Sequence, residues 1–491
     1  MSFRGKLING VFWTTSMRWS IKMSGIVSTA ILARLLTPED YGLVAIGLIL
    51  VGFIKIFFDL GVELSLIRDA NATKEDFDTA WSMRLLQSWI IGVLIALSAP
   101  LAAWGYEDPR LESVFYWCSL AVFIKAFENI GVVEFQKSMD FKTDFIFRVV
   151  SKLGGVACTI ALAFYYRNYL ALLVGVVCQH LISVVASYYF SRMRVKFSLS
   201  GWRKLWDFSR WMLVKNIGNY VANRGDYLLI AKFVPLSSVG YYRWAHELNT
   251  LVTSELMQPI SRVLFPGFAQ FESQPEKLLS IYRRSLNMIV SIAIPCILGL
   301  GVVAPEAIPL LLGGGDKWLP VVPLLQLITI AALFRCLHSL ANNYLIVIGL
   351  VRLTAYLDTL RTIVAIALLY PSFVWGGLNG VIYLKILISF LMMLSYYYLL
   401  IKNTALVISE IVSDLWRPLL AGLIMAACVF SVPLWIESSS LLIVLLCKVV
   451  VGSVSYGSVL ALLWLFSGKP ESFESEAVYY CGGYLKRVLN S

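Results

Sequence analysis

The sequence predicts an all-α, polytopic membrane protein with about fourteen transmembrane helices. Hydrophobic residues make up 59% of its 491 residues, and the mean hydropathy is +0.76. Charged residues make up only 14%, whereas soluble domains carry about a quarter. Because this deficit extends along the whole chain, most of the protein surface is expected to face lipid.

Transmembrane segments are recognised as apolar stretches of about 20 residues, bounded by turn residues and clusters of charge. The first six predicted spans cover residues 10–33, 41–62, 81–104, 112–133, 146–166 and 168–190. The next six cover residues 209–232, 241–262, 286–304, 320–348, 353–371 and 377–400. The last two cover residues 415–435 and 440–467.

The distribution of Lys and Arg predicts which side of the membrane each loop faces, because cytoplasmic loops are enriched in both residues. With a cytoplasmic N-terminus, 25 of the 41 Lys and Arg fall on the cytoplasmic side and five on the other. This asymmetry predicts an even number of spans, with both termini in the cytoplasm. It also accounts for the net charge of +11 without nucleic acid as a partner.

A weak internal repeat appears when the chain is shifted by 198 residues. Ala33-Arg-Leu-Leu36 then aligns with Ala231-Lys-Phe-Val234, and Gly42 aligns with Gly240. Six spans return the chain to its starting side, so the halves are predicted to be parallel repeats around a central cationic cavity. The predicted parts are an N-terminal lobe (1–192), a basic interfacial linker (193–208), a C-terminal lobe (209–402), two further helices (403–468) and a cytoplasmic tail (469–491).

The sequence contains no recognisable catalytic or metal-binding motif. Its eight cysteines are scattered without a CxxC pair, and its three histidines are too dispersed for a metal site. It has neither a Gly-rich phosphate loop nor a nucleophile elbow. We therefore expect no enzymatic activity, no cofactor and no metal ion.

Eleven Lys and Arg fall inside the predicted spans, where a cation at the bilayer centre costs about 2.5–3.5 kcal/mol. They are Arg18, Lys22, Lys55, Lys125, Lys215, Arg224, Arg243, Arg335, Arg361, Lys385 and Lys448. Arg18 and Lys22 lie four residues apart on one face of the first span, which contains no acid. We interpret them as substrate-binding residues. The alternative is pairing with an acid on another helix, such as Asp59, Asp226 or Glu255.

Other cations in the spans have simpler explanations. Three pairs have an acid at pairing distance on the same helix: Lys55 with Asp59, Lys125 with Glu128, and Asp358 with Arg361. Lys215 and Lys448 lie close enough to helix ends to extend toward the interface. Arg243, His246 and Glu247 share one surface of the eighth span, where they form either a structural network or an outer gate with a proton-sensitive histidine.

Three segments carry a family resemblance: Leu32-Ala-Arg-Leu-Leu-Thr-Pro-Glu-Asp-Tyr-Gly42, Phe135-Gln-Lys-Ser-Met-Asp-Phe141 and Arg262-Val-Leu-Phe-Pro-Gly-Phe-Ala-Gln270. They resemble the end of the first helix and the loops of bacterial polysaccharide-transport proteins. Those proteins belong to the multidrug/oligosaccharidyl-lipid/polysaccharide exporter superfamily. The resemblance implies fourteen helices, arranged as two six-helix lobes and a terminal pair.

The resemblance also implies a function. It predicts a flippase that moves an undecaprenyl-pyrophosphate-linked repeat unit of O-antigen, capsule or exopolysaccharide across the bacterial inner membrane by alternating access. In related flippases, cations of the first, second, seventh and eighth helices line the cavity. The substrate-binding residues implied here by position are Arg18, Lys22, Lys55, Arg224 and Arg243. The candidates for gating or ion coupling are Asp59, Asp226, His246 and Glu247.

The implied partners are the lipid-linked oligosaccharide, membrane lipid, H⁺ or Na⁺, and the polysaccharide polymerase machinery. Two rival functions stay open. One is a drug/cation antiporter of the same superfamily, whose cationic substrates an excess of buried cations would repel. The other is a membrane polymerase or ligase of polysaccharide assembly. Such an enzyme would use a large external loop, whereas the longest predicted external connection, Ala304–Pro320, holds few catalytic residue types.

Overall fold

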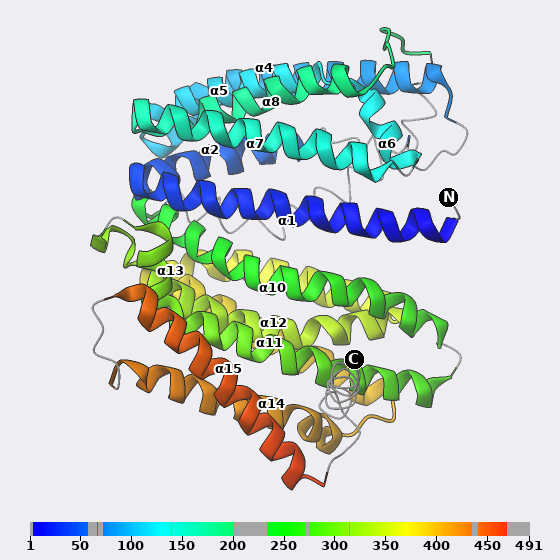
Figure 1. Cartoon of the computed structure of the whole chain (residues 1–491), viewed down its shortest axis with the longest axis vertical. Helices are drawn as coiled ribbons and strands as arrows, with labels where there is room; N and C mark the ends of the chain where they lie inside the picture. Colours follow the sequence, from blue (N-terminus) through cyan, green and yellow to red (C-terminus); the bar gives the residue numbers. More distant parts are fainter. Residues whose placement is uncertain are drawn as a thin grey trace, which may run out of the picture. The chain divides into compact units, whose positions relative to one another are not determined.

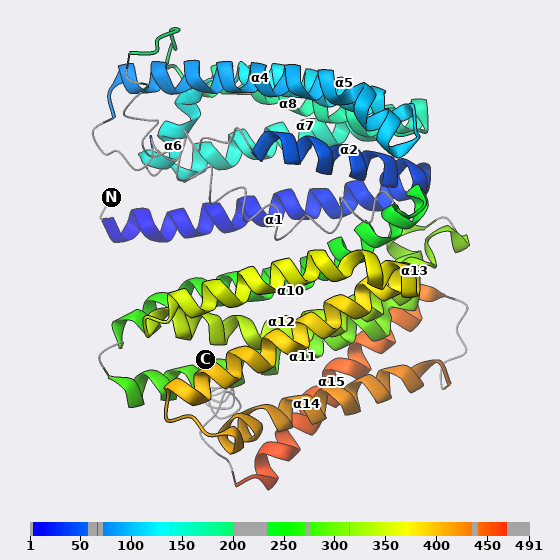
Figure 2. The same cartoon turned by 180° about the vertical axis from the view of Figure 1, so that it is seen from behind.

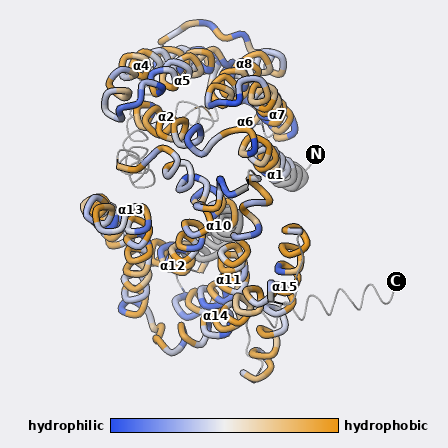
Figure 3. The backbone as a smooth tube through the Cα atoms, turned by 90° about the vertical axis from the view of Figure 1, so that its left-hand side faces the viewer, coloured by the Kyte–Doolittle hydropathy of each residue, from blue (hydrophilic) through white to orange (hydrophobic). Residues whose placement is uncertain are grey.

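The computed structural model describes residues 3–56, 66, 72–138, 140–200, 202, 233–271, 274–313, 315–434 and 440–468. Across these ranges the regular structure is helical, with no β-strand. Eight helices in this part of the chain are long and apolar enough to cross a membrane. Figure 3 shows hydrophobic residues along most of the helix lengths. The prediction of an all-α, polytopic membrane fold is confirmed.

The N-terminal helices follow the order of the first six predicted spans. They are α1 (Phe3–Leu35), α2 (Pro38–Ile56), α4 (Lys74–Tyr106), α5 (Arg110–Ala126), η1 (Ile130–Val132), α6 (Val133–Lys137), α7 (Phe141–Tyr166) and α8 (Leu170–Phe190). Helices α4, α5, α7 and α8 pack alongside one another (Figure 1).

The predicted span 112–133 was too long, because α5 ends at Ala126. Asn129 stabilises the interruption with three hydrogen bonds. Its side-chain oxygen accepts from the backbone N–H of Gly131 at 2.9 Å, and its Nδ2 donates to the carbonyl of Met193 at 2.7 Å. Its own backbone N–H donates to Ser187 Oγ at 2.9 Å. Because these bonds satisfy polar groups outside a helix, the chain turns here into η1 and α6 although it remains apolar.

The C-terminal helices also follow the predicted order, although most are longer. They are α10 (Leu236–Gln270), α11 (Pro275–Leu312), η2 (Gly315–Trp318), α12 (Val321–Val347), α13 (Val351–Asn403), α14 (Ile408–Ser431), η3 (Val432–Leu434) and α15 (Leu441–Phe466). The extension of α11 to Leu312 shortens the predicted connection Ala304–Pro320. The predicted span 209–232 lies outside the described residues, so the count of fourteen stays a prediction.

Helix α13 contains two predicted spans, 353–371 and 377–400, joined at a kink (Figure 2). The kink lies at Gly376 and Gly377, whose backbone leaves the helical region. Gly377 has a φ of 57°, a left-handed conformation that glycine adopts without the steric cost of a Cβ atom. The label α13 therefore covers two helices, one for each predicted span, which meet at this kink.

The structure divides into two compact units, Met1–Gly240 with Leu312–Gly314, and Tyr241–Leu311 with Gly315–Ser491. The first turn of α10 belongs to the first unit, where it packs against the start of α2. A Cβ atom on Gly42 would lie 1.8 Å from the carbonyl oxygen of Leu236, and one on Gly240 would lie 2.2 Å from that of Pro38. These contacts are reciprocal under the 198-residue shift, which aligns Pro38 with Leu236 and Gly42 with Gly240. Neither position has room for a side chain.

The second unit has its main hydrophobic core between α11, α12 and the second half of α13. Tyr282, Tyr344 and Tyr396 are fully buried in it, and the ring centroids of Tyr282 and Tyr344 lie 5.0 Å apart. Helices α14 and α15 form a smaller hydrophobic core with α11. Tyr456 on α15 donates a hydrogen bond to the backbone carbonyl of Ser291 on α11 at 2.8 Å. The predicted lobe and linker boundaries stay predictions, since residues 203–232 lie outside the described part of the chain.

Candidate functional site

Arg18 and Lys22, the leading sequence candidates, lie on α1 with different exposure. Arg18 is exposed and shares an exposed stripe with Trp19 and Met23, whereas Lys22 is half-buried. Helix α1 packs against α7, with the rings of Trp13 and Phe145 5.1 Å apart. The substrate-binding role of this pair stays a prediction.

The remaining sequence candidates fall into two groups. Arg224, Asp226 and Asp59 lie outside the described residues. Lys55 is exposed on the last turn of α2, and on α10 Arg243 and His246 are half-buried while Glu247 is exposed.

His246 contacts neighbouring residues of its own helix. Its ring centroid lies 6.4 Å from that of Tyr242, and its Nδ1 lies 3.3 Å from Thr250 Oγ1. The structure therefore places His246 beside the ring of Tyr242 and the hydroxyl group of Thr250. Its predicted gating or coupling role stays open.

Glu128, just beyond the end of α5, is the centre of a buried polar group in the first unit. Its carboxylate accepts hydrogen bonds from Lys125 Nζ on α5 and from Ser183 Oγ on α8. Its backbone carbonyl accepts a bond from Arg84 Nη2 on α4. Glu128 is only 4% exposed, so three helices converge on one buried residue. The predicted Lys125–Glu128 pair is confirmed, and we call Arg84, Lys125, Glu128 and Ser183 the Glu128 cluster.

His180 lies one turn before Ser183 on α8 and extends this polar region. It is within electrostatic range of Lys125, Lys55 and Glu128, which come from three other segments of the first unit. The sequence pattern did not identify His180, because its charged neighbours come from other helices and its own helix carries no charged residue. These residues together carry two lysines against one carboxylate, which is an excess of positive charge.

Tyr242 is the centre of a second polar group, in the second unit. It is fully buried, and Lys385 from the second half of α13 donates a hydrogen bond to its hydroxyl. Lys385 Nζ also lies 5.1 Å from the centroid of the Tyr242 ring. Arg335 on α12 is within electrostatic range of both Tyr242 and Arg361.

The same group includes one acid. Asp358 and Arg361, on the first half of α13, form the predicted i,i+3 ion pair at 3.7 Å. We call Tyr242, Arg335, Asp358, Arg361 and Lys385 the Tyr242 cluster. It contains three cations against one carboxylate, so it too carries an excess of positive charge.

The interpretation of Lys448 as a residue extending toward the interface was wrong. Its side chain is 4% exposed, and its Nζ donates to Glu306 Oε1 on α11 at 2.7 Å. Burying a lone ammonium is costly, and the carboxylate of Glu306 offsets that cost. Sequence spacing could not find this pair, because the two residues are 142 positions apart.

Comparisons with known proteins agree with this fold. A profile of the polysaccharide biosynthesis protein family matches residues 31–323. The lipopolysaccharide biosynthesis protein WzxC of Escherichia coli (strain K12) is 24% identical over 381 residues, covering 77% of this chain and 76% of that protein. The lipid II flippase MurJ in an inward closed conformation has a TM-score of 0.73 at 13% identity, covering 92% of this chain and 99% of that chain.

A second solved structure widens the comparison. An inward-facing multidrug resistance MATE family transporter of the MOP superfamily has a TM-score of 0.59 at 14% identity, covering 77% of this chain and 93% of that chain. The fold is thus that of a multi-pass membrane protein with the architecture seen in these transporters. Within this class, the chain belongs to the polysaccharide biosynthesis protein family.

Proposed function

We propose that the protein is a flippase for a lipid-diphosphate-linked oligosaccharide in the bacterial inner membrane, with both termini in the cytoplasm. The observation that carries the proposal is the excess of cations in both polar clusters. Arg84 and Lys125 outnumber Glu128 in the first cluster, and Arg335, Arg361 and Lys385 outnumber Asp358 in the second.

The excess of positive charge in the clusters complements the diphosphate, which is the part of the substrate that costs most to move through the membrane. A diphosphate carries negative charge through a medium of low dielectric, where an unpaired charge is strongly penalised. Arginine and lysine side chains offset this cost, and arginine can also bind phosphate oxygens through two donors at once. The family relationship supports the same substrate, since WzxC is named for lipopolysaccharide biosynthesis.

The fold does not distinguish the flippase from a drug/cation antiporter, because both a lipid II flippase and a MATE transporter share it. The charge does distinguish them. A cationic substrate would be repelled by either cluster, whereas an anionic head group would be attracted. No covalent chemistry is required, so the proposed activity is translocation and not polymerisation or ligation.

The proposed cycle is alternating access. The cytoplasm-facing state takes the diphosphate toward Arg18, Lys22 and the other predicted cavity cations, and the transporter then opens to the outer side. A gradient of H⁺ or Na⁺ resets the cycle, with His246, Glu247, Asp59 and Asp226 as candidate carriers. The polymerase machinery that consumes the translocated unit is the expected partner.

Reconstitution into vesicles tests the proposal directly. A fluorescent oligosaccharide linked to a prenyl diphosphate is supplied on one leaflet, and its protection from an external quencher is followed. We expect Arg18→Ala and Lys22→Ala to slow translocation at least about tenfold, since each removes one charge-assisted contact.

The matched control is Lys142→Ala, which removes an exposed lysine from the first turn of α7. It should translocate at the wild-type rate. Wild-type rates in both Arg18→Ala and Lys22→Ala would refute the assigned residues. Transport of a cationic dye in place of the lipid would refute the flippase itself and favour the antiporter.

A further inference from the structure

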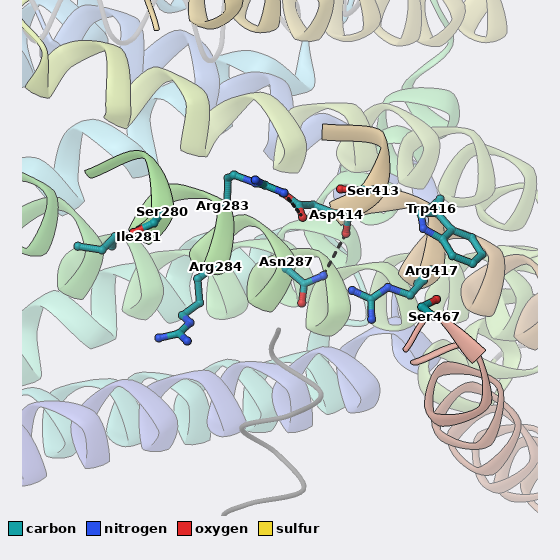
Figure 4. Close-up of a pocket in the computed structure, with 10 residues that line it drawn as sticks. All are labelled: Ser280, Ile281, Arg283, Arg284, Asn287, Ser413, Asp414, Trp416, Arg417 and Ser467. Atoms are coloured by element: carbon teal, nitrogen blue, oxygen red, sulfur yellow. Dashed lines mark hydrogen bonds and ion pairs between the residues drawn. The ribbon is translucent and has the colours of Figure 1, made fainter. Parts of the chain in front are cut away.

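A basic cavity of about 670 Å³ lies in the second unit between α11, α14 and the end of α15. Ten residues line it, shown in Figure 4: Ser280, Ile281, Arg283, Arg284, Asn287, Ser413, Asp414, Trp416, Arg417 and Ser467. Three arginines face one aspartate in this set. None of the ten belongs to either polar cluster or to the predicted substrate-binding residues.

Arg283 links helix α11 to helix α14 on one side of the cavity. Its Nε and Nη2 donate to the two carboxylate oxygens of Asp414 at 2.8 and 3.1 Å, and its Nη1 donates to Glu410 Oε1 at 2.6 Å. Asn287 adds a hydrogen bond from Nδ2 to the backbone carbonyl of Asp414 at 3.0 Å. These bonds join α11 to the first turns of α14, so the cavity has a fixed polar frame.

Arg284 and Arg417 supply the remaining positive charge. Figure 4 shows Arg284 pointing away from the ion pair of Arg283 and Asp414. Arg284 is exposed, whereas Arg417 is buried, with 3% of its surface exposed. Arg283, Arg284 and Arg417 carry three positive charges, and the acids bonded to Arg283, Asp414 and Glu410, carry two negative charges. The net formal charge of these five residues is therefore +1. This matches the single negative charge of a phosphodiester.

The surroundings of the cavity are suited to a lipid and not to a soluble anion. Trp416, at the cavity, is 39% exposed, and tryptophan is enriched at membrane–water interfaces. The last turns of α15 expose Leu462, Leu465 and Phe466 beside Ser467, and Phe466 is 86% exposed. Acyl chains can cover these side chains while a head group occupies the basic cavity.

The sequence places this cavity on the cytoplasmic side, where the loop-charge pattern puts Arg283, Arg284 and Arg417. Basic pockets between transmembrane helices on this side bind the head groups of anionic lipids. We propose that the cavity between α11, α14 and α15 binds the phosphate of an anionic phospholipid. The lipid would join α11 to the terminal pair of helices. This inference requires only that the chain spans a membrane, and it does not depend on the transported substrate.

The test measures lipid binding to the purified, full-length protein in a neutral detergent. Phosphatidylglycerol is titrated and the bound lipid is counted by native mass spectrometry, with phosphatidylethanolamine as the zwitterionic comparison. We expect phosphatidylglycerol to bind at least about tenfold more tightly than phosphatidylethanolamine. Arg284→Gln should weaken phosphatidylglycerol binding by about the same factor, because one charge-assisted contact is lost.

Two further variants separate site-specific binding from general attraction. Arg284→Lys keeps the charge and should retain more affinity than Arg284→Gln. Arg352→Gln removes an exposed arginine at the start of α13, away from the cavity residues, and should bind as the wild type does. Since Arg284 and Arg352 are both exposed, neither change is expected to prevent folding.

Several outcomes would overturn the proposal. One is equal binding of the two lipids, and another is equal phosphatidylglycerol affinity in Arg284→Gln and the wild type. Competition by sodium pyrophosphate would support phosphate recognition at this site. Pyrophosphate binding without any phosphatidylglycerol binding would overturn the assignment to a lipid. A failure of the flippase proposal would leave these lipid measurements unchanged, so the two proposals can fail separately.

Discussion

The Glu128 cluster and the Tyr242 cluster stabilise positive charge in different ways. In the first, a carboxylate accepts hydrogen bonds from Lys125 and Ser183 and neutralises the lysine. In the second, Lys385 contacts both the hydroxyl and the ring of Tyr242, and an aromatic face attracts a cation without cancelling its charge. A cation held by an acid joins helices, whereas a cation held by an aromatic ring remains able to attract an anion.

Polar residues in and beside the two clusters lie on corresponding helices of the predicted repeat. Lys55, Lys125 and His180 belong to the second, fourth and sixth predicted spans. Tyr242, Arg335 and Lys385 belong to the eighth, tenth and twelfth. The same helices of each repeat thus carry polar groups, but the anchoring residue is an acid in one and a tyrosine in the other. We expect changes at acid-held cations to reduce stability, and changes at ring-held cations to reduce transport.

The largest loss of stability is expected for Lys448→Met, at the most deeply buried acid-held cation. The change leaves Glu306 without its ammonium partner, and breaking a buried pair costs about 3–5 kcal/mol. Thermal unfolding in detergent should show a large decrease in the midpoint temperature. The double variant Lys448→Met/Glu306→Gln should recover most of it, because no unpaired charge remains. An unchanged midpoint in the single variant would mean that the pair contributes nothing to the fold.

A smaller loss is expected for Glu128→Gln in the first unit. The amide can still accept from Ser183, but the charge-assisted bond from Lys125 is lost, at a cost of about 1–3 kcal/mol. The measurement is thermal unfolding, accompanied by translocation per folded molecule, which should stay at the wild-type value. Glu75→Gln, at an exposed position of α4, is the control. Reduced translocation in a fully stable Glu128→Gln protein would contradict the structural role.

Lys385→Met should show the opposite pattern. Losing the contact with Tyr242 costs only about 1 kcal/mol of stability, whereas translocation of the lipid-diphosphate should fall about tenfold. The vesicle assay and thermal unfolding are measured on the same preparation. Tyr242→Phe keeps the ring and the lysine, so its translocation should fall less. If Lys385→Met lost stability and kept its rate, the distinction between the two clusters would be wrong.

The smallest effect is expected at an acid–cation pair in the loop between α4 and α5. Hydrogen bonding from Arg110 holds the pKa of Asp108 below its ordinary value. A lowered carboxyl pKa stabilises the fold above the unfolded-state pKa, and this contribution disappears as the pH falls through the folded-state pKa. Because Arg110 is half exposed, Arg110→Gln should cost only about 0.2–1 kcal/mol at neutral pH.

The difference between Arg110→Gln and the wild type should shrink in acid and at high salt, since both weaken the ion pair. Unfolding midpoints measured across acidic and neutral pH provide the check. A difference that grows as the pH falls would contradict the direction of the Asp108 pKa shift.

Pairs set by short sequence spacing were predicted well from the sequence. The Asp358–Arg361 pair was found because residues three apart on a helix are neighbours, and the Lys125–Glu128 pair has the same spacing although Glu128 lies just beyond the end of α5. The end of α5 was missed, since the bonds of Asn129 to Ser187 and Met193 come from residues distant in the sequence. Glu306, Ser183 and Tyr242 were missed as partners for the same reason.

Hydropathy and loop charge were sufficient to predict an all-α membrane protein and the order of its described helices, because both depend on local composition. The sequence also predicted which charges lie in the membrane. It did not reveal that Lys448 pairs with Glu306, or that Lys385 donates a hydrogen bond to Tyr242. Those partners depend on the rotation and register of one helix against another. Side-chain packing across the whole unit sets that register, so it cannot be predicted from any local pattern in the sequence.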